Sequence, residues 1–223
     1  MKITYLKIIT NRPVSETSFY LRGYFGNKFR DRSIFHHHLD DIGLIYLYPR
    51  IQYKIIEGIP LIVGLSEGAK ILEEISPDIK ELKLNSSYYN VDSIIVKTIE
   101  YKPTMTRRPI QYSLITPWIA LNQKNNIIYN NLRNFKEKKD FINRILVGNI
   151  LSFCKGFGIV CNRRLYAHTH IDAEEVLFKG VQMNAFKGKI RMNFDFPDFI
   201  GIGKASSFGF GSIQKVINGD SNQ

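Results

Sequence analysis

Apolar and polar residues alternate along the first hundred positions in a pattern that predicts a fixed order of strands and helices. Strands show a period of two residues and amphipathic helices a period near 3.6. The expected elements are a strand at residues 1–9, a helix at 15–29, strands at 44–56 and 59–65, a helix at 67–75 and a weaker strand at 82–84 or 94–99. Glu57-Gly58 separates the two middle strands as a hairpin turn. This order is that of a ferredoxin-like βαββαβ unit.

A similar order recurs in the second half of the chain. The expected elements are a strand at 110–121, a helix at 136–155, a hairpin formed by 176–185 and 189–196 around Lys187-Gly188, and a strand at 211–216. The helix is the clearest of these, because its apolar side chains cover one broad face. We therefore expect an α+β protein of two tandem ferredoxin-like domains, at residues 1–104 and 105–216, with a flexible tail at 217–223.

The second strand of the predicted hairpin has one apolar face and one polar face that is mostly basic. The apolar side holds Ile190, Met192, Phe194 and Phe196, and the polar side holds Lys189, Arg191, Asn193 and Asp195. A one-sided pattern of this kind is typical of a strand with one face in the core and one in water. His168 and His170 alternate as on an exposed strand. We interpret them as surface residues, with metal coordination or RNA contact as the alternatives.

The charge of the chain indicates an anionic partner. The net charge is +11, from 31 Lys and Arg against 20 Asp and Glu in 223 residues. Such a balance favours nucleic acid or an anionic membrane surface. The membrane is the weaker interpretation, because no run of about 18 apolar residues occurs. Residues 1–10 also lack the apolar core and cleavage site of a signal peptide.

The two cysteines, Cys154 and Cys161, form no CxxC pair. A chain with so few cysteines is expected to be a reduced, cytoplasmic protein without a disulfide framework or zinc knuckle. Both cysteines are interpreted as small buried hydrophobic residues.

The segment 201–211 contains two Gly-x-Gly pairs, a lysine and two serines. Glycine lets backbone N–H groups approach an anion closely, and Lys204, Ser206 and Ser207 add further donors. A Walker loop is excluded because Gly203-Lys204 is followed by alanine, and a dinucleotide fingerprint because Ser206 stands where its third glycine would be. A structural hairpin or bulge and a clamp on the RNA backbone remain, and the net charge favours the clamp.

Three consecutive histidines, His36, His37 and His38, follow the first predicted helix. Adjacent histidines rarely converge on one metal ion, and no carboxylate or thiol with ligand spacing supports a metal site. A solvated loop is the structural alternative. The chemical interpretation is acid–base catalysis, since imidazole titrates near pH 6.5. Cleavage of RNA without a metal needs one group that takes the 2′-OH proton and another that protonates the leaving 5′ oxygen. Lys28, Lys54 and Lys204 are candidates to stabilise charge on the phosphate.

These features together resemble a known family. The chain is similar to the CRISPR-associated endoribonucleases of the RAMP superfamily, which cut precursor CRISPR RNA within each repeat. The likeness is greatest to the branch found in subtype I-B systems. It extends from about residue 20 to residue 213 and is carried by the glycine-rich segment Gly201–Gly211 and by residues 21–29, 36–39, 48–54, 116–122 and 143–151.

The resemblance implies an activity, and from the family's pattern it implies site residues. The expected reaction is a metal-independent cut that leaves a 2′,3′-cyclic phosphate and a 5′-hydroxyl, with no cofactor. The implied catalytic residues are two of the three histidines, Tyr46 or Tyr48, and Lys54. His36 and His38 are preferred to His37 because they point the same way if the loop is extended. The expected RNA-binding residues are Arg22, Lys28, Arg107, Arg108, Arg191, Gly201, Gly203, Lys204, Ser206, Ser207, Gly209 and Gly211.

The expected partner is CRISPR repeat RNA, bound by a monomer or a homodimer. The alternative function is a non-catalytic RNA-binding subunit of a CRISPR effector complex, because RAMP proteins often bind RNA without cutting it. The histidine cluster favours the enzyme, since a protein that only binds RNA has no need of three histidines in that loop.

Overall fold

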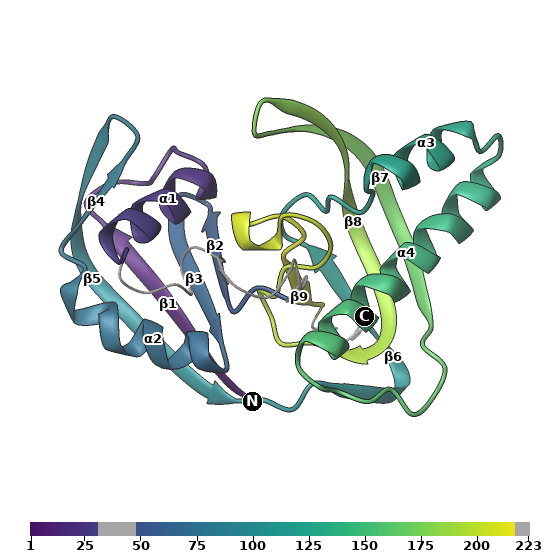
Figure 1. Ribbon diagram of the computed structural model, residues 1–223, viewed down its shortest axis with the longest axis horizontal. Coiled ribbons are helices and arrows are strands. Elements are labelled where there is room, and N and C mark those ends of the chain that lie inside the picture. Colours follow the sequence, from purple (N-terminus) through teal and green to yellow (C-terminus); the bar gives the residue numbers. More distant parts are fainter. Residues whose placement is uncertain (31–47, 217–223) are drawn as a thin grey trace, which may run out of the picture. The chain divides into compact units, whose positions relative to one another are not determined.

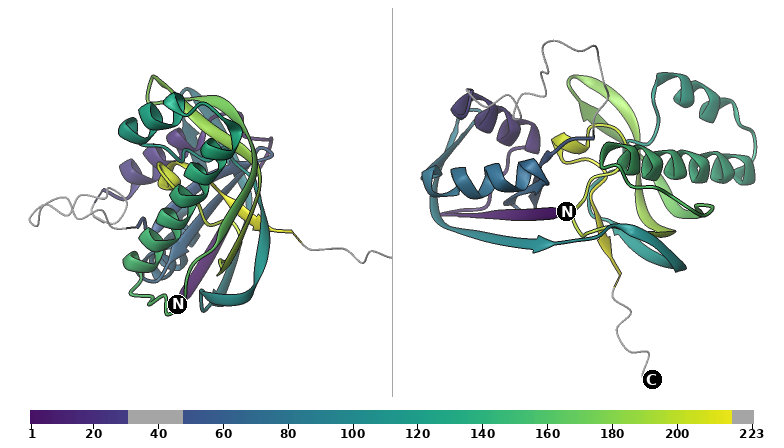
Figure 2. Two further views of the ribbon diagram at one scale, coloured as in Figure 1. Left: turned by 90° about the vertical axis from the view of Figure 1, so that its right-hand side faces the viewer. Right: turned by 60° about the horizontal axis from the view of Figure 1, so that its bottom comes forward.

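The structure is a computed structural model that describes residues 1–30 and 48–216 (Figure 1). The described chain divides into two units. The first contains residues 1–102 and 206–209, and the second contains residues 103–205 and those from 210 onward. Each unit is built on one antiparallel sheet, and the elements of both can be followed in the two rotated views of Figure 2.

The first unit has a five-stranded sheet in the order β2-β3-β1-β5-β4. Its elements are β1 (Lys2–Thr10), α1 (Ser18–Lys28), β2 (Ile51–Ile56), β3 (Ile59–Leu65), α2 (Glu67–Ile75), a 3-10 turn η2 (Ser76–Asp78), β4 (Glu81–Leu84) and β5 (Ser87–Glu100). Strands β2, β3, β1 and β5 have the ferredoxin-like order, and β4 is an additional edge strand that pairs with β5. The two alternative positions predicted for the last strand are therefore both strands, joined as a hairpin.

Both helices of the first unit pack on the same face of its sheet. Leu6 and Ile8 of β1 contribute to one buried cluster with Leu21 and Phe25 of α1 and with residues of α2. Phe25 has no exposed surface. Its burial contributes about 1.5–3 kcal/mol, so α1 is held mainly by packing on the sheet.

The second unit has a four-stranded sheet in the order β7-β8-β6-β9. Its elements are β6 (Thr104–Leu114), α3 (Gln123–Asn131), α4 (Phe135–Gly156), β7 (Ala167–Phe178), β8 (Val181–Asp195) and β9 (Ile213–Lys215). The strand order is again ferredoxin-like. The second helix of that fold is absent from the described part of this unit, and an irregular segment that contains the glycine-rich run connects β8 to β9. The expectation of two tandem ferredoxin-like domains is confirmed.

The predicted hairpin around Lys187-Gly188 is wrong. Residues 181–195 form one continuous strand, and the hairpin turns at Lys179 and Gly180, which have φ of 52° and 77°. Gly188 lies within the β7–β8 ladder opposite Ile171, with φ of 126°. A glycine in the sequence can mark a turn, but it can also lie inside a strand where another backbone comes close. Here the His170 carbonyl occupies the space where a Cβ of residue 188 would lie.

Helix α3 was not predicted from the hydrophobic pattern, because it buries no residue completely. Its start is nevertheless encoded, since the Asn122 side chain accepts a hydrogen bond from the Asn125 backbone N–H at 2.7 Å. Asn134 caps α4 in the same way, through Glu137 N–H at 2.8 Å. Caps of this kind stabilise a helix by about 1 kcal/mol. The sequence signal for α3 is therefore its cap rather than its apolar face.

Candidate functional site

The predicted catalytic residues divide between described and undescribed parts of the chain. His36, His38 and Tyr46 lie outside the described residues. Tyr48 and Lys54 are described, and both are buried. Tyr48 lies three residues before the start of β2, and Lys54 lies within that strand.

A chain of hydrogen bonds joins Tyr48 to Lys54 through Gln52. The Lys54 ammonium donates to Gln52 Oε1 at 3.0 Å, and Gln52 Nε2 donates to the Tyr48 hydroxyl oxygen at 3.2 Å. Gln52 and Lys54 point to the same side of β2 because they are two residues apart. Neither has any exposed surface. The lysine is thus fixed in position by a neutral amide.

Burial changes the proton affinity of two of these groups. Removal from water penalises the charged ammonium and lowers the pKa of Lys54 from 10.5 to about 7. Burial of the Tyr48 phenol raises its pKa, which keeps the hydroxyl protonated as a hydrogen-bond donor and acceptor. Lys54 is consequently a lysine that gains or loses a proton near neutral pH, which is unusual for a lysine and typical of functional sites.

Lys28 lies in the last turn of α1 and is exposed. Its ammonium donates to the Tyr24 hydroxyl at 3.2 Å and to the Asp78 carbonyl at 2.8 Å. A cation at a helix C-terminus is favoured by the helix dipole. Of the three lysines considered for charge stabilisation, Lys28 is exposed and stands closest in sequence to the histidines, while Lys54 is buried.

Arg22 contacts the 3-10 turn η3 (Ser206–Phe208), which belongs to the first unit. Its guanidinium carbon lies 4.0 Å from the centre of the Phe208 ring. One turn earlier in α1, the Ser18 hydroxyl donates to the Phe208 carbonyl oxygen. The Phe19 ring stacks on Phe208 at a centroid distance of 5.8 Å. Burial lowers the pKa of Arg22. The Arg22 guanidinium therefore contacts protein at the Phe208 ring.

The glycines of the 201–211 segment meet local packing requirements. Gly203, Gly209 and Gly211 have φ of 79°, 91° and 66°, which favours glycine at each. A Cβ on Gly203 would overlap the Trp118 indole, and one on Gly209 would lie 2.8 Å from the Tyr53 carbonyl oxygen.

Several polar groups of the same segment already have partners inside the protein. The Lys204 N–H donates to the Ile119 carbonyl at 2.9 Å, and the Gly211 N–H to the Pro117 carbonyl at 2.7 Å. Ser206 and Ser207 are buried. These groups hold the shape of the loop, and its contact with RNA remains a prediction.

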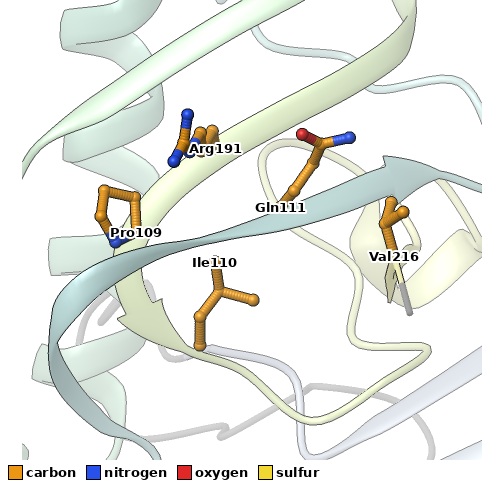
Figure 3. A pocket seen from close by; sticks show the side chains of 5 residues that line it. All are labelled: Pro109, Ile110, Gln111, Arg191 and Val216. Atoms are coloured by element: carbon orange, nitrogen blue, oxygen red, sulfur yellow. The ribbon is translucent and has the colours of Figure 1, made fainter. Parts of the chain in front are cut away.

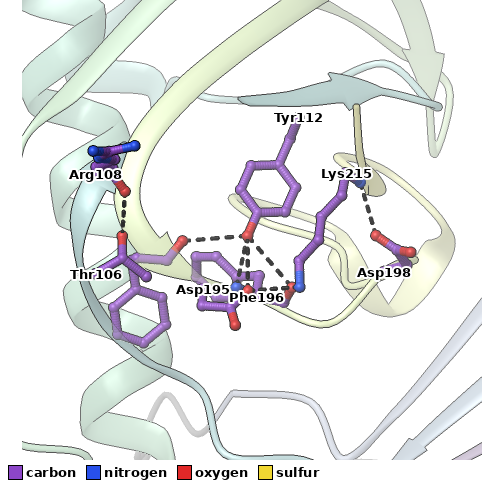
Figure 4. A network of polar contacts seen from close by, with 8 residues as sticks. Thr106, Arg108, Tyr112, Asp195, Phe196, Asp198 and Lys215 are labelled. Carbon is purple, nitrogen blue, oxygen red and sulfur yellow. Dashed lines mark hydrogen bonds and ion pairs between the residues drawn. The ribbon is translucent and has the colours of Figure 1, made fainter. Parts of the chain in front are cut away.

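Arg107 and Arg108 lie in a bulge of β6. Residues 106–109 of β6 stand opposite the single residue Asn193 of β8, since Met105 pairs with Phe194 and Ile110 with Met192. The Thr106 hydroxyl donates to the Arg108 carbonyl at 2.7 Å and closes the bulge (Figure 4). Both arginines are exposed as a result.

The polar network in Figure 4 fixes the strands beside the bulge. The Phe196 N–H donates to the Tyr112 hydroxyl at 2.8 Å, and the Lys215 ammonium lies 2.7 Å from Asp195 Oδ1. Burial raises the pKa of Tyr112. The network joins β6, β8 and β9 and so fixes the strands next to the bulge that contains Arg107 and Arg108.

Sequence reasoning did not identify Gln52, Ser18 or Phe208 as part of these arrangements. For Gln52 a signal was present, because a period of two places it beside Lys54 on one side of the strand. No local sequence pattern predicts the contact between Ser18 and Phe208, because these residues lie near opposite ends of the sequence.

Comparison with known proteins agrees with this architecture over the whole described chain. A family model for the Cas6b N-terminal domain matches residues 1–102, and one for the Cas6b C-terminal domain matches residues 104–216. This chain belongs to the Cas6b family.

Relatives of this Cas6b chain include two solved structures. One, described as "Crystal structure of Cas6b", is 35% identical with a TM-score of 0.88. The other, described as "Crystal structure of CRISPR RNA processing endoribonuclease Cas6b", is 32% identical with a TM-score of 0.75. Each match covers 97% of this chain and 100% of the other. An uncharacterized protein of Methanocaldococcus jannaschii is 37% identical over 145 residues, which are 64% of this chain and 97% of that protein.

Within the described residues, no helix is long and apolar enough to cross a membrane. Across residues 1–30 and 48–216, no group of three or more His, Cys, Asp and Glu side chains is arranged to hold a metal ion.

Proposed function

We propose that this Cas6b-family protein is an endoribonuclease that cuts precursor CRISPR RNA within its repeats and so releases mature guide RNAs. The observation that carries the proposal is that three consecutive histidines lie inside an N-terminal half that matches the Cas6b domain. Both halves of the chain match a family whose solved members include a CRISPR RNA processing endoribonuclease.

The proposed chemistry is an attack by the RNA on itself, directed by His36 and His38. A neutral imidazole nitrogen of one histidine takes the proton from a ribose 2′-OH. The 2′ oxygen bonds to the adjacent phosphorus and the bond from phosphorus to the 5′ oxygen breaks. The imidazolium of the other histidine donates its proton to that oxygen. The products are a 2′,3′-cyclic phosphate and a 5′-hydroxyl, and no metal ion takes part.

Exposure and burial suggest different roles for the two lysines near this segment. Lys28 is exposed at the end of α1, so we assign it to direct contact with the phosphate whose charge increases during the reaction. The Lys54 ammonium is buried and donates a hydrogen bond to Gln52, which in turn donates one to the Tyr48 hydroxyl. We assign Lys54 and Tyr48 to positioning the start of β2, which follows the histidine segment, and Tyr46 remains the alternative tyrosine for the chemistry.

The test is incubation of the full chain with its repeat RNA in excess EDTA. Cleavage that persists in EDTA, and that stops when the nucleotide before the cut carries a 2′-deoxyribose, is the expected result. Loss of cleavage in EDTA would identify a metal-dependent nuclease. Tight binding of intact RNA under all conditions would identify an RNA-binding subunit of an effector complex and overturn the proposal.

A further inference from the structure

Helix α4 ends in a turn that reverses the direction of the chain. Gly158 has φ of 65°, and its N–H donates to the Lys155 carbonyl at 3.4 Å. The Ile159 N–H donates to the Cys154 carbonyl at 2.8 Å. These two bonds form a Schellman motif, in which a residue in the left-handed region ends the helix. In Figure 1 the chain leaves the end of α4 and turns back toward β7.

The reversal brings the two cysteines of the chain into contact. The Cys161 thiol donates to the Cys154 sulfur, and the two Sγ atoms lie 3.5 Å apart. Both residues are free thiols, with Cys154 buried and Cys161 partly exposed. The sulfurs of a disulfide are about 2 Å apart, so closure requires an approach of about 1.5 Å. The two thiols are therefore close to the arrangement that a disulfide requires.

The backbone on both sides of this pair is held in place by packing and hydrogen bonds. Before the pair, Phe153 of α4 has no exposed surface and contacts Phe196 at a ring-centroid distance of 4.8 Å. After the pair, Asn193 of β8 holds the segment that leads into β7. Its Oδ1 accepts from the Tyr166 N–H at 2.7 Å, and its Nδ2 donates to the Arg164 carbonyl at 3.0 Å. The fold itself thus sets the distance between the two thiols.

The two thiols differ in their access to solvent, and this difference sets the order in which they react. Cys161 is partly exposed, so a dissolved oxidant reaches it first. Cys154 is only 2% exposed, and burial raises the pKa of its thiol, which is therefore rarely ionised at neutral pH. Cys154 is suited to a second step, in which it attacks a sulfur that is already held beside it.

We propose that Cys154 and Cys161 form an oxidation-sensitive pair that closes to a disulfide when it meets a low-molecular-weight disulfide such as oxidised glutathione. The Cys161 thiolate attacks one sulfur of the small disulfide, whose S–S bond breaks, and a mixed disulfide forms as one thiolate leaves. The Cys154 thiol then loses its proton to water, and its sulfur attacks the Cys161 sulfur and displaces the second thiolate. The two departing thiolates take up the two protons that the cysteines lose. The protein is oxidised by two electrons, and the small disulfide is reduced by two.

The bond joins the last turn of α4 to the segment before β7 and stabilises the folded chain by restricting the unfolded one. Residues 154–166 include none of the residues expected to act in catalysis or RNA binding. They also contribute nothing to a shallow pocket of about 380 Å³ in the same unit (Figure 3). That pocket is lined by Pro109, Ile110, Gln111, the exposed Arg191 and Val216. The thiol pair is therefore independent of the proposed function.

The experiment treats the full chain, first reduced and then freed of reductant, with oxidised glutathione. Intact mass and non-reducing electrophoresis follow the reaction. The wild type is expected to lose two hydrogens, to retain no glutathione and to remain a single chain. Cys154→Ala is expected to retain one glutathione on Cys161, because the second step is removed. Cys161→Ser is the matched control, and its buried remaining thiol is expected not to react.

Thermal melts measure what the bond does to stability. The melting temperature of the oxidised wild type should exceed that of the reduced protein by about 5–10 °C, and the same treatment should leave Cys161→Ser unchanged. Circular dichroism checks that each variant is folded, and Cys161→Ser alone decides the outcome if Cys154→Ala does not fold. Two thiols that stay free, glutathione that stays on the wild type, or a bond between two chains would each overturn the inference. A bond that forms without raising the melting temperature would overturn its stabilising role.

Discussion

The Arg22 guanidinium lies over the ring of Phe208, 4.0 Å from its centre, although the two residues come from opposite ends of the sequence. The contact connects α1, which leads into the histidine segment, with the last turn of the glycine-rich region. Arg22 was expected to bind RNA, and nothing in the structure tests that role. Its position gives it a second role in joining these two segments.

Arg22→Ala and Phe208→Ala are each expected to destabilise the protein, by about 0.5–1 kcal/mol for the lost cation–π contact. Phe208→Ala should cost more, because the Phe208 ring also stacks on Phe19. Urea unfolding of both single variants and the double variant gives the coupling energy. A coupling near zero would show that the contact carries no energy. Arg30→Ala, at an exposed arginine, serves as the control.

His36→Ala and His38→Ala are each expected to lower the single-turnover cleavage rate by ~10²–10⁴, the usual contribution of a general acid or base. RNA affinity should change little. His37→Ala is the matched control. If the segment is extended, His37 points away from His36 and His38, and this variant should retain most of the activity. Variants that lose affinity but keep the rate would refute the catalytic assignment.

Lys54 makes stability depend on pH. Its pKa is about 7 in the folded protein and 10.5 for a lysine in water, which is the value we take for the unfolded chain. Between pH 7 and pH 10.5 the unfolded chain therefore binds more protons than the folded protein. The free energy of unfolding should therefore rise with pH across this window, by up to about 1.4 kcal/mol per unit, and Lys54→Met should abolish that rise. Below pH 7 the variant should be the more stable protein. Urea titrations at pH 6, 8 and 9.5 measure this, and the exposed Lys97→Met should leave the slope unchanged.

Gly203 is expected to tolerate no side chain. Gly203→Ala would combine a φ of 79° with overlap on the Trp118 indole, whose Nε1 donates to Asn149 Oδ1 at 3.0 Å. We expect a loss of about 1–3 kcal/mol. Gly148→Ala is the control, because Gly148 lies in α4 with no atom within 4 Å of its added Cβ. That change should stabilise the helix by up to about 1 kcal/mol. Equal effects of the two changes in thermal melts would contradict the packing role.

The hydrophobic pattern identified most elements of the fold because each signal was local. The run 59–65, the helix 67–75 and the turn between the two middle strands are found where the pattern placed them. Their apolar faces repeat with the period of the element that buries them, so composition and spacing were sufficient. The pattern was wrong at Lys187-Gly188, where a glycine inside a long strand has the same local sequence signal as a turn.

The amino-acid sequence by itself determined two ferredoxin-like halves, a basic chain and a histidine cluster with the composition of an acid–base site. Only the tertiary structure decided that Lys54 is buried with a lowered pKa, that Arg22 faces Phe208, and that His168, Arg191 and Gln111 lie in one row. The physical reason is that burial and register depend on contacts between residues far apart in the chain. Those contacts form only when the strands pair and the helices pack on them.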